Sequence, residues 1–351
     1  MHKGIKTFVG IFLTVIWLVS CKKKKKSGEA KIAVIAESEN QWTGLAISEE
    51  GRLFVNFPKW SPGANISVAE IIKGETKAYP SEKINTRIAD SSSLHRFSCV
   101  QSVFIGPENH LWILDPANPY FKGVEKTGPR LYKVDLENDS ITRIFTFDPG
   151  VYKENSYFND VRIDGQSKHA YITDSNDGAI IVLDLASGKA RRLLDDHPAT
   201  SAETNFLVIQ EDTLKIEVDS DGIALSNDSK DLYFAALSGH RLYKVPTALL
   251  KDTSIKKSEI VKAVQKVADI VATDGILFND YGTLFLGGLE NNSVYTYHPD
   301  AGYSRMFSHP EIKWADSFAK DNKGSIYFTT SQIHLPENER GKYKIFKIVY
   351  K

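Results

Sequence analysis

The sequence is poor in cysteine and has no excess of either charge. Only two of its 351 residues are cysteines, Cys21 and Cys99, while Lys plus Arg and Asp plus Glu number 44 each. Two cysteines are too few for a scaffold held by disulfides, so the fold has to be stabilised by its core alone. A nucleic-acid-binding surface is normally strongly basic, so this charge balance argues against a nucleic-acid partner.

The common catalytic motifs are also missing. The sequence contains no Gly-x-Ser-x-Gly elbow and no His-Glu-x-x-His zinc helix, and its nine histidines are scattered without metal-ligand spacing. We expect residues 238–240, Ser-Gly-His, to form a turn between strands. Cys99 has no local motif that would place a histidine beside it, so we expect a small buried side chain and not a thiol nucleophile.

The N-terminal segment has the features of an export signal. Lys3 and Lys6 precede an apolar stretch, 7–19, that is too short to span a bilayer comfortably. The stretch ends in Leu-Val-Ser-Cys at 18–21, which resembles the lipobox of bacterial lipoproteins, where the cysteine is acylated and becomes the new N-terminus. The alternative is an ordinary signal peptide or an uncleaved anchor.

This resemblance divides the chain into a lipoprotein signal peptide (1–20), a lysine-rich tether (21–30) and a folded domain (31–351), with lipidation at Cys21. It predicts a bacterial protein of the cell envelope, anchored to a membrane through its lipid on the periplasmic side or the outer surface. Because seven of the basic residues lie in the first thirty, the folded domain is mildly acidic, which favours a cationic small ligand or a metal over an anionic substrate.

A strand–turn–strand unit recurs along the folded domain. Each copy has a short apolar strand, a turn containing Gly, Asn or Asp, and a strand rich in aromatic or β-branched residues, which is typical of hairpins. The six copies cover 43–55, 101–114, 159–173, 221–237, 274–287 and 316–329. Further strands of the same kind are expected at 66–71, 131–134, 180–183, 242–245, 294–297 and 345–348.

The spacing of these copies matches the blades of a β-propeller with insertions in its loops. The sequence therefore predicts an all-β, six-bladed β-propeller, most simply a monomer, in which residues 31–36 supply the outer strand of the last blade and so close the ring. Residues 254–268 have apolar positions at helical spacing and predict one short inter-blade helix. We expect 75–96 and 192–210 to be long polar loops.

Several motifs are more specific than a generic propeller. Gly-Arg-Leu-Phe-Val-Asn-Phe-Pro-Lys-Trp at 51–60 is similar to the first-blade signature of the yellow / major royal jelly protein family. Further similar segments lie at 111–115, 159–164, 170–175, 221–226 and 314–318. The resemblance runs in order from about residue 42 to 335, although the disulfide cysteines of that family are absent.

The family resemblance implies a ligand pocket on the propeller axis, but it does not imply one reaction. Members include secreted pigment-pathway proteins, some described as dopachrome-converting, salivary amine binders and nutritive proteins. A more distant resemblance is to the regucalcin and gluconolactonase propellers, which hold a divalent metal on the axis and hydrolyse sugar lactones.

The first residues of the inner strands are candidate ligand-binding residues, because these strands line the channel of a propeller. They are Gln101, Asn159, Asp160, Asp221, Asp274 and Asp316, and Thr43 is the corresponding residue of the first copy at the mouth of the channel. Such an oxygen-rich group would suit Ca²⁺ or Mg²⁺, with Asn159, Asp221 and Asp274 as metal ligands, and would equally suit a protonated amine. Closely spaced carboxylates would also raise one another's pKa and supply a general base. Alternatively, each residue only caps its own turn.

The metal hypothesis has a weak point in the first blade. The lactonase pattern needs a glutamate there, and this chain has Thr43-Gly44, with Glu37 and Glu39 a few residues earlier. We expect Asp115, Asp174 and Glu290, which follow second strands, to fix outer loops. Four aromatic residues flank the axial positions and are candidates for stacking on a cationic or ring-bearing ligand: Trp42, Tyr157, Phe158 and Trp314.

The sequence thus favours a membrane-tethered, yellow-related propeller that binds a small organic ligand in its axial pocket, with a tautomerase-like activity as an extension of that hypothesis. One alternative is a metal-dependent sugar-lactone hydrolase with Ca²⁺ or Mg²⁺ as cofactor. The other is a non-enzymatic interaction scaffold.

Overall fold

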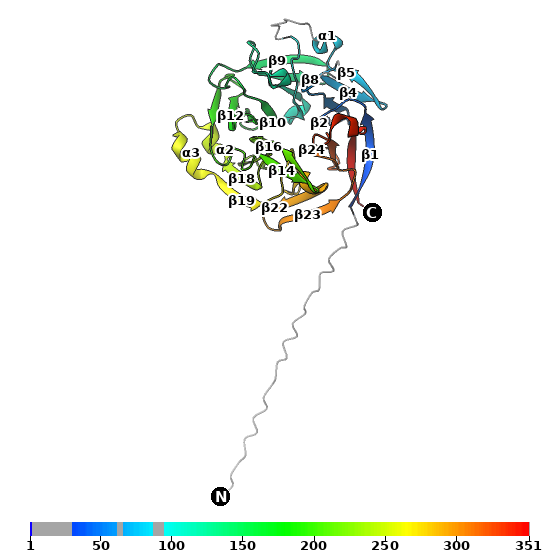
Figure 1. Cartoon of the computed structure of the whole chain (residues 1–351). Helices are drawn as coiled ribbons and strands as arrows, with labels where there is room; N and C mark the ends of the chain where they lie inside the picture. Colours follow the sequence, from blue (N-terminus) through cyan, green and yellow to red (C-terminus); the bar gives the residue numbers. More distant parts are fainter. Residues whose placement is uncertain (2–29, 62–65, 87–94, 351) are drawn as a thin grey trace.

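The computed structural model describes Met1 and residues 30–61, 66–86 and 95–350. Within these residues, six four-stranded antiparallel sheets surround a central axis as the blades of a β-propeller (Figure 1). Their innermost strands contact one another in the order β2, β6, β10, β16, β20 and β24, and β24 returns to β2. The predicted fold is therefore confirmed.

The blades follow the repeats in the sequence, and each blade has four strands that run from the axis outward in chain order, except at the edge of blade six. Blade one is β2 Leu45–Ile47, β3 Leu53–Asn56, β4 Val68–Ile72 and β5 Glu75–Ala78; blade two is β6 Ser102–Ile105, β7 Leu111–Asp115, β8 Arg130–Asp135 and β9 Ser140–Thr146; blade three is β10 Phe158–Asp164, β11 His169–Asp174, β12 Ala179–Asp184 and β13 Ala190–Leu193. Blade four is β16 Ser220–Leu225, β17 Asp231–Ala236, β18 Arg241–Pro246 and β19 Gln265–Asp269; blade five is β20 Ile276–Phe278, β21 Leu284–Gly288, β22 Ser293–His298 and β23 Gly302–Ser308. Blade six is β24 Ala315–Lys320, β25 Ile326–Thr330, β26 Tyr343–Tyr350 and β1 Ala30–Ser38.

Blade six closes the ring with strands from both ends of the chain, as expected. The N-terminal strand β1 pairs antiparallel with β26, from Ala30 opposite Tyr350 to Ser38 opposite Tyr343. This pairing satisfies the outer edge of β26 and ties the first described segment to the last (Figure 1).

The strand directions define two ends of the axial channel. All six inner strands begin at one end, which we call the upper end, and reach their hairpin turns at the other, the lower end. Because β24, β25, β26 and β1 alternate in direction, β1 begins at the lower end and finishes at the upper end.

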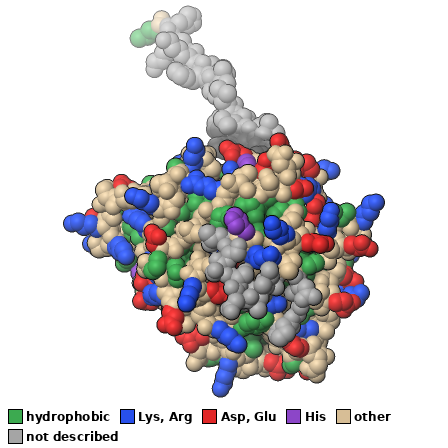
Figure 2. All heavy atoms as spheres, turned by 90° about the horizontal axis from the view of Figure 1, so that it is seen from above, with side chains coloured by type: hydrophobic (Ala, Val, Ile, Leu, Met, Phe, Trp, Pro, Cys, Tyr) green, Lys and Arg blue, Asp and Glu red, His purple; other side chains and the backbone are tan. Residues whose placement is uncertain are grey.

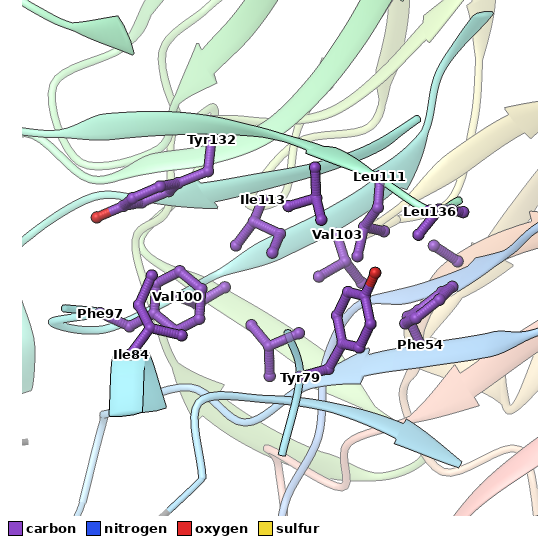
Figure 3. Packing of buried hydrophobic residues seen from close by; sticks show 13 residues of the cluster. Phe54, Tyr79, Ile84, Phe97, Val100, Val103, Leu111, Ile113, Tyr132 and Leu136 are labelled. Atoms are coloured by element: carbon purple, nitrogen blue, oxygen red, sulfur yellow. The ribbon is translucent and has the colours of Figure 1, made fainter. Parts of the chain in front are cut away.

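The core lies between neighbouring blades. Figure 3 shows one such cluster, in which Phe54 of blade one packs with Val103, Leu111 and Ile113 of blade two. The four side chains are at most 3% exposed. Each sheet thus buries one face against the next blade around the ring, which makes every blade depend on its neighbours.

The outer parts of several blades differ from the expected loops. Residues 75–96 begin with the strand β5 and the helix α1 Glu82–Asn85, and 87–94 lie outside the described residues. Residues 192–210 include the end of β13 and the strand β14 Phe206–Ile209, which forms an additional hairpin with β15 Asp212–Lys215. The strands β5 and β15 are polar and mostly exposed, whereas β14 is an apolar run of only four residues inside a polar segment.

The predicted helix at 254–268 is only partly correct. The helix α3 Lys257–Ala263 is shorter, lies inside blade four after a second helix α2 Thr247–Lys251, and is followed by the strand β19. Backbone pairing with β18 therefore decides the conformation of 265–269, although its apolar spacing also fits a helix.

The surface carries charges of both signs. Figure 2 shows Lys and Arg side chains interspersed with Asp and Glu on the face that it presents. Among the described residues, no helix is long and apolar enough to cross a membrane. Cys99 is buried and unpaired there, as expected, while Cys21 lies outside them.

We predict that Phe346→Ala will destabilise the whole ring. Phe346 of β26 is fully buried and packs on Phe328, with the two ring centroids 5.4 Å apart. Loss of a buried phenylalanine typically costs about 3–5 kcal/mol of unfolding free energy. Tyr281→Ala is the control, because Tyr281 is 86% exposed and its loss should cost under about 0.5 kcal/mol. Equal denaturant midpoints for the two variants would contradict this account of ring closure.

Candidate functional site

Irregularities at the upper ends of three inner strands aim polar residues at the axis. The pairing registers of β10, β16 and β24 each shift between the first strand residue and the fourth. In β16 the shift includes Asp221 and Gly222. A bulge bends a strand and redirects its side chains, which explains how residues adjacent to the strand start come to face the channel.

The glycine of the Asp-Gly pair is required by close packing between blades. A Cβ on Gly222 would lie 2.3 Å from the carbonyl oxygen of Asp274, and one on Gly275 would lie 2.4 Å from that of Asp316. These two glycines let the upper ends of blades four, five and six approach closely. The Asp-Gly motif is therefore a packing requirement at the axis.

The axial side chains form a continuous hydrogen-bonded chain. The Tyr157 hydroxyl donates to Gln101 Oε1 at 3.0 Å, and Gln101 Nε2 donates to Asn159 Oδ1 at 3.1 Å. Asn159 Nδ2 then donates to Asp221 Oδ2 at 2.5 Å. These residues come from blades two, three and four, so the chain follows the ring.

The chain continues through blades five and six. Asp221 and Asp274 hydrogen-bond to each other through their side chains, and Trp314 Nε1 donates to Asp274 Oδ2 at 2.8 Å. Asp316 lies beside Asp274 and accepts a hydrogen bond from the Ser317 hydroxyl at 3.2 Å. The structure thus brings together seven of the ten predicted ligand-binding residues, which we call the axial cluster: Gln101, Tyr157, Asn159, Asp221, Asp274, Trp314 and Asp316.

The other three predicted residues have different surroundings. Asp160 pairs with Arg162 Nη1 at 2.8 Å and accepts a hydrogen bond from the Ser102 hydroxyl. Phe158 is fully buried against Phe147 in the core between blades two and three, so its stacking role is corrected to packing.

Trp42 is corrected in the same way. It is fully buried in the core between blades six and one, where it contacts Phe57. In blade one, Thr43 Oγ1 donates to the Gln101 carbonyl oxygen at 3.3 Å, so this threonine positions the backbone of the axial cluster.

Burial makes the carboxyl groups of the axial cluster hard to ionise. Asp221, Asp274 and Asp316 are 3%, 8% and 3% exposed. Desolvation raises the pKa of each well above its ordinary value, and the neighbouring aspartates raise it further. Burial therefore favours the protonated form of these carboxyl groups, which can donate as well as accept hydrogen bonds.

The axial cluster as arranged does not fit a divalent metal. Among the described residues, no group of three His, Cys, Asp or Glu side chains is close enough to hold a metal ion. Of the proposed ligands, Asp221 receives the Asn159 amide N–H and Asp274 receives the Trp314 indole N–H. Because each of these donors occupies one oxygen of its carboxyl group and burial favours the protonated form, we derive no step through a metal.

Glu37 and Glu39 do not reach the axis and instead pair with Lys342, which lies immediately before β26. Asp115 accepts hydrogen bonds from the backbone of Ser98 and Cys99 and pairs with Arg130, which confirms that it fixes a loop. Asp174 similarly accepts from the Tyr157 backbone and pairs with Arg192, and Glu290 pairs with His240.

Three aromatic neighbours of the axial cluster were not predicted. Trp60 Nε1 donates to the Tyr157 hydroxyl at 2.8 Å, and Phe121 lies 4.7 Å from the Tyr157 ring. The ring of His334 stacks on that of Trp314, with the centroids 6.0 Å apart. Burial and the positive charges of Lys313 and Arg340 lower the pKa of His334 to about 4. Trp60 ends the first-blade motif at 51–60, but nothing in the local sequence marks Phe121 or His334.

These features define a six-bladed propeller with a buried, hydrogen-bonded polar cluster at the upper end of its axis. The family model described as major royal jelly protein matches residues 98–330, and the chain belongs to this family. This confirms the family resemblance found in the sequence.

One similar curated protein is the yellow-related salivary protein LJM17 of Lutzomyia longipalpis, 25% identical over 232 residues. The match covers 60% of this chain and 56% of that relative, so it spans little more than half of the relative's length.

Solved structures share the fold at low sequence identity. A gluconolactonase from Xanthomonas campestris has a TM-score of 0.60 at 11% identity, covering 92% of this chain and 91% of its own. Virginiamycin B lyase from Staphylococcus aureus has a TM-score of 0.54 at 13% identity, covering 92% of this chain and 100% of its own. These likenesses concern the fold alone.

The raised pKa values predict that the folded protein loses stability as the pH rises. At a pH above about 4, an unfolded aspartate is ionised while the buried one keeps its proton, so the native state binds more protons. Each such group then lowers the free energy of unfolding by up to about 1.4 kcal/mol per pH unit, until the pH passes its folded pKa.

Asp274→Asn should flatten this dependence, because asparagine mimics the protonated acid and does not titrate. Asp300→Asn, at a side chain that is 94% exposed, is the matched control and should leave the slope unchanged. The measurement is urea unfolding between pH 4 and 8; parallel curves for all three proteins would contradict a buried neutral Asp274.

Proposed function

We propose that the axial cluster binds a small, uncharged organic molecule that carries several hydrogen-bonding groups. The observation that supports this is the continuous chain from Tyr157 to Trp314, which offers both donors and acceptors at one end of the channel. The aromatic group formed by Trp60, Phe121 and Tyr157 lies next to it and provides flat apolar surface for a ring. Polar groups that converge beside aromatic side chains are typical of small-molecule sites.

The protonated carboxyl groups also account for the preference for an uncharged ligand. A cationic amine would gain most from an ionised aspartate, so its binding would have to expel a proton from Asp221 or Asp274. An uncharged ligand can instead accept from a carboxyl O–H and donate to a carboxyl C=O with no change in protonation.

We further propose that the paired carboxyl groups catalyse a tautomerisation. In such a reaction one proton leaves a carbon atom and one proton is added to an oxygen atom of the same molecule. Asp221 and Asp274 are hydrogen-bonded to each other, so one can give its proton to the ligand oxygen and take the proton of the other, whose carboxylate then receives the proton that leaves carbon. The N–H donors of Asn159 and Trp314 would stabilise a carboxylate formed on either residue during the transfer.

A test of this function uses dopachrome methyl ester, an uncharged quinone whose tautomerisation is followed by loss of colour. We expect saturable acceleration by the wild-type protein and a loss of about 100-fold in Asp274→Asn, which cannot exchange a proton. Asp300→Asn is the control and should be unaffected. Calorimetric titrations in two buffers of different ionisation enthalpy should agree, since binding an uncharged ligand releases no proton.

Each contrary outcome has a distinct meaning. If the protein binds dopachrome methyl ester without accelerating its tautomerisation, the tautomerase proposal is contradicted but the ligand site is not. If it neither binds nor accelerates, the ligand site is contradicted as well. Gluconolactone hydrolysis that stops with EDTA and returns with Ca²⁺ or Mg²⁺ would instead establish the metal-dependent lactonase. Capture of a protein partner that survives Asp221→Ala with Asp274→Ala would favour the interaction scaffold.

We also propose that the chain is exported and held at a membrane by lipid on Cys21, because residues 18–21 resemble a lipobox. In a bacterial host given labelled palmitate, the full chain should be labelled and should sediment with membranes, and Cys21→Ala should abolish both. Cys99→Ala is the matched control, because this thiol is buried in the propeller and should not be acylated. Labelling that persists in Cys21→Ala would contradict the anchor.

A further inference from the structure

The lower end of the axial channel contains a cavity that no residue of the axial cluster lines. It has a volume of about 640 Å³ and is lined by the last residues of the inner strands and the turns that follow them, from all six blades. We call it the lower funnel. Its volume lies within the range of about 300–1,000 Å³ that is usual for small-molecule sites.

The wall of the lower funnel has both polar and apolar parts, and the apolar part comes from several blades. Phe104, Leu225, Leu277 and Phe318 each come from a different blade and line the cavity. Phe104 and Leu225 are only half-buried, so apolar surface is open to an occupant. Contact with these side chains would favour a molecule with an apolar body.

Arg162 is the one arginine that lines the lower funnel among the described residues. Its Nη1 donates to Asp160 Oδ1 at 2.8 Å, and its Nη2 reaches from blade three to the Ile276 carbonyl oxygen of blade five at 2.9 Å. The guanidinium group also lies over the Phe104 ring at 5.0 Å. Arg162 thus crosses the channel and separates the lower funnel from the upper end.

One donor of this side chain is unused. Arg162 is 6% exposed, and within the described part of the chain its buried Nε–H has no hydrogen-bond partner. Buried donors are normally paired, and an unpaired one destabilises the empty protein. This Nε has almost no accessible surface in the empty protein, so the Arg162 side chain has to shift slightly before a ligand oxygen at the inner end of the lower funnel can supply the missing acceptor.

The charges around the cavity favour an uncharged ligand over an anion. Asp160 already balances the charge of Arg162. Near the rim, Lys320 pairs with Asp280 and Lys347 pairs with Asp321, while Glu49 adds a negative charge. An anion would therefore approach an acidic rim and then find a guanidinium group that is already neutralised.

We propose that the lower funnel is a second ligand site, which takes an uncharged, mainly apolar molecule ending in a carbonyl oxygen. The apolar part contacts the wall, and the carbonyl oxygen accepts the hydrogen bond of Arg162 Nε. The site is independent of the axial cluster, because Arg162 and Asp160 lie between the two.

The test uses 2-decanone and decanoate, which share an apolar chain and differ in the charge of the oxygen-bearing end. Binding to the full chain is measured by saturation-transfer NMR and titration calorimetry. We expect 2-decanone to bind saturably and decanoate to bind at least tenfold more weakly. Leu225→Trp, which fills the wall without touching Arg162, should abolish 2-decanone binding.

Arg162→Lys removes Nε while keeping a positive charge beside Asp160, and should weaken 2-decanone binding by about tenfold. Circular dichroism checks that both variants are folded. If Arg162→Lys does not fold, the result for Leu225→Trp still shows whether 2-decanone binds in the lower funnel. Three results would overturn the proposal: no saturable 2-decanone binding, binding that survives Leu225→Trp, or decanoate binding as tightly as the ketone. Binding that is lost in Asp274→Asn would assign the ketone to the axial cluster and also overturn it.

Discussion

The pairing of β1 with β26 is the constraint on which the rest of the molecule depends. Each blade buries a face against the next, so an open ring would leave two apolar faces exposed and the outer edge of β26 unpaired. Closure also fixes the diameter of the channel, because the six inner strands have to meet around one axis. The axial cluster combines residues of blades two to six and therefore exists only in the closed ring.

Closure and the polar character of the channel act in opposite directions on stability. Bringing several carboxyl groups together away from water would be very costly if they were ionised. The protein reduces this cost in two ways, by favouring the protonated form of Asp221, Asp274 and Asp316 and by pairing Asp160 with Arg162. The first solution leaves exchangeable protons at the upper end, and the second leaves a fixed ion pair on blade three. The two ends of one channel thus have different chemistry.

The sequence was sufficient to predict the hairpins near the axis, because their strands are apolar and their turns carry Gly, Asn or Asp. The outermost strands were harder: β5 is exposed and polar, and β19 has apolar residues at a spacing that also fits a helix. Side-chain direction was the other limit. Phe158 and Asn159 are adjacent in the sequence, yet one enters the core and the other faces the axis. Phe121 and His334 reach the axial cluster through long loops, and such contacts cannot be read from local sequence.

The direction of β1 has a consequence for how the protein would meet its surroundings. β1 begins at the lower end, which is also the end of the lower funnel. If the proposed lipid on Cys21 holds the chain close to this end, the lower funnel would face the membrane, where uncharged apolar molecules partition. The axial cluster would then lie on the side of the bulk solvent, where hydrogen-bonding solutes are found. The two ends of the channel would then be in contact with environments of opposite polarity, and the Arg162 side chain lies between them.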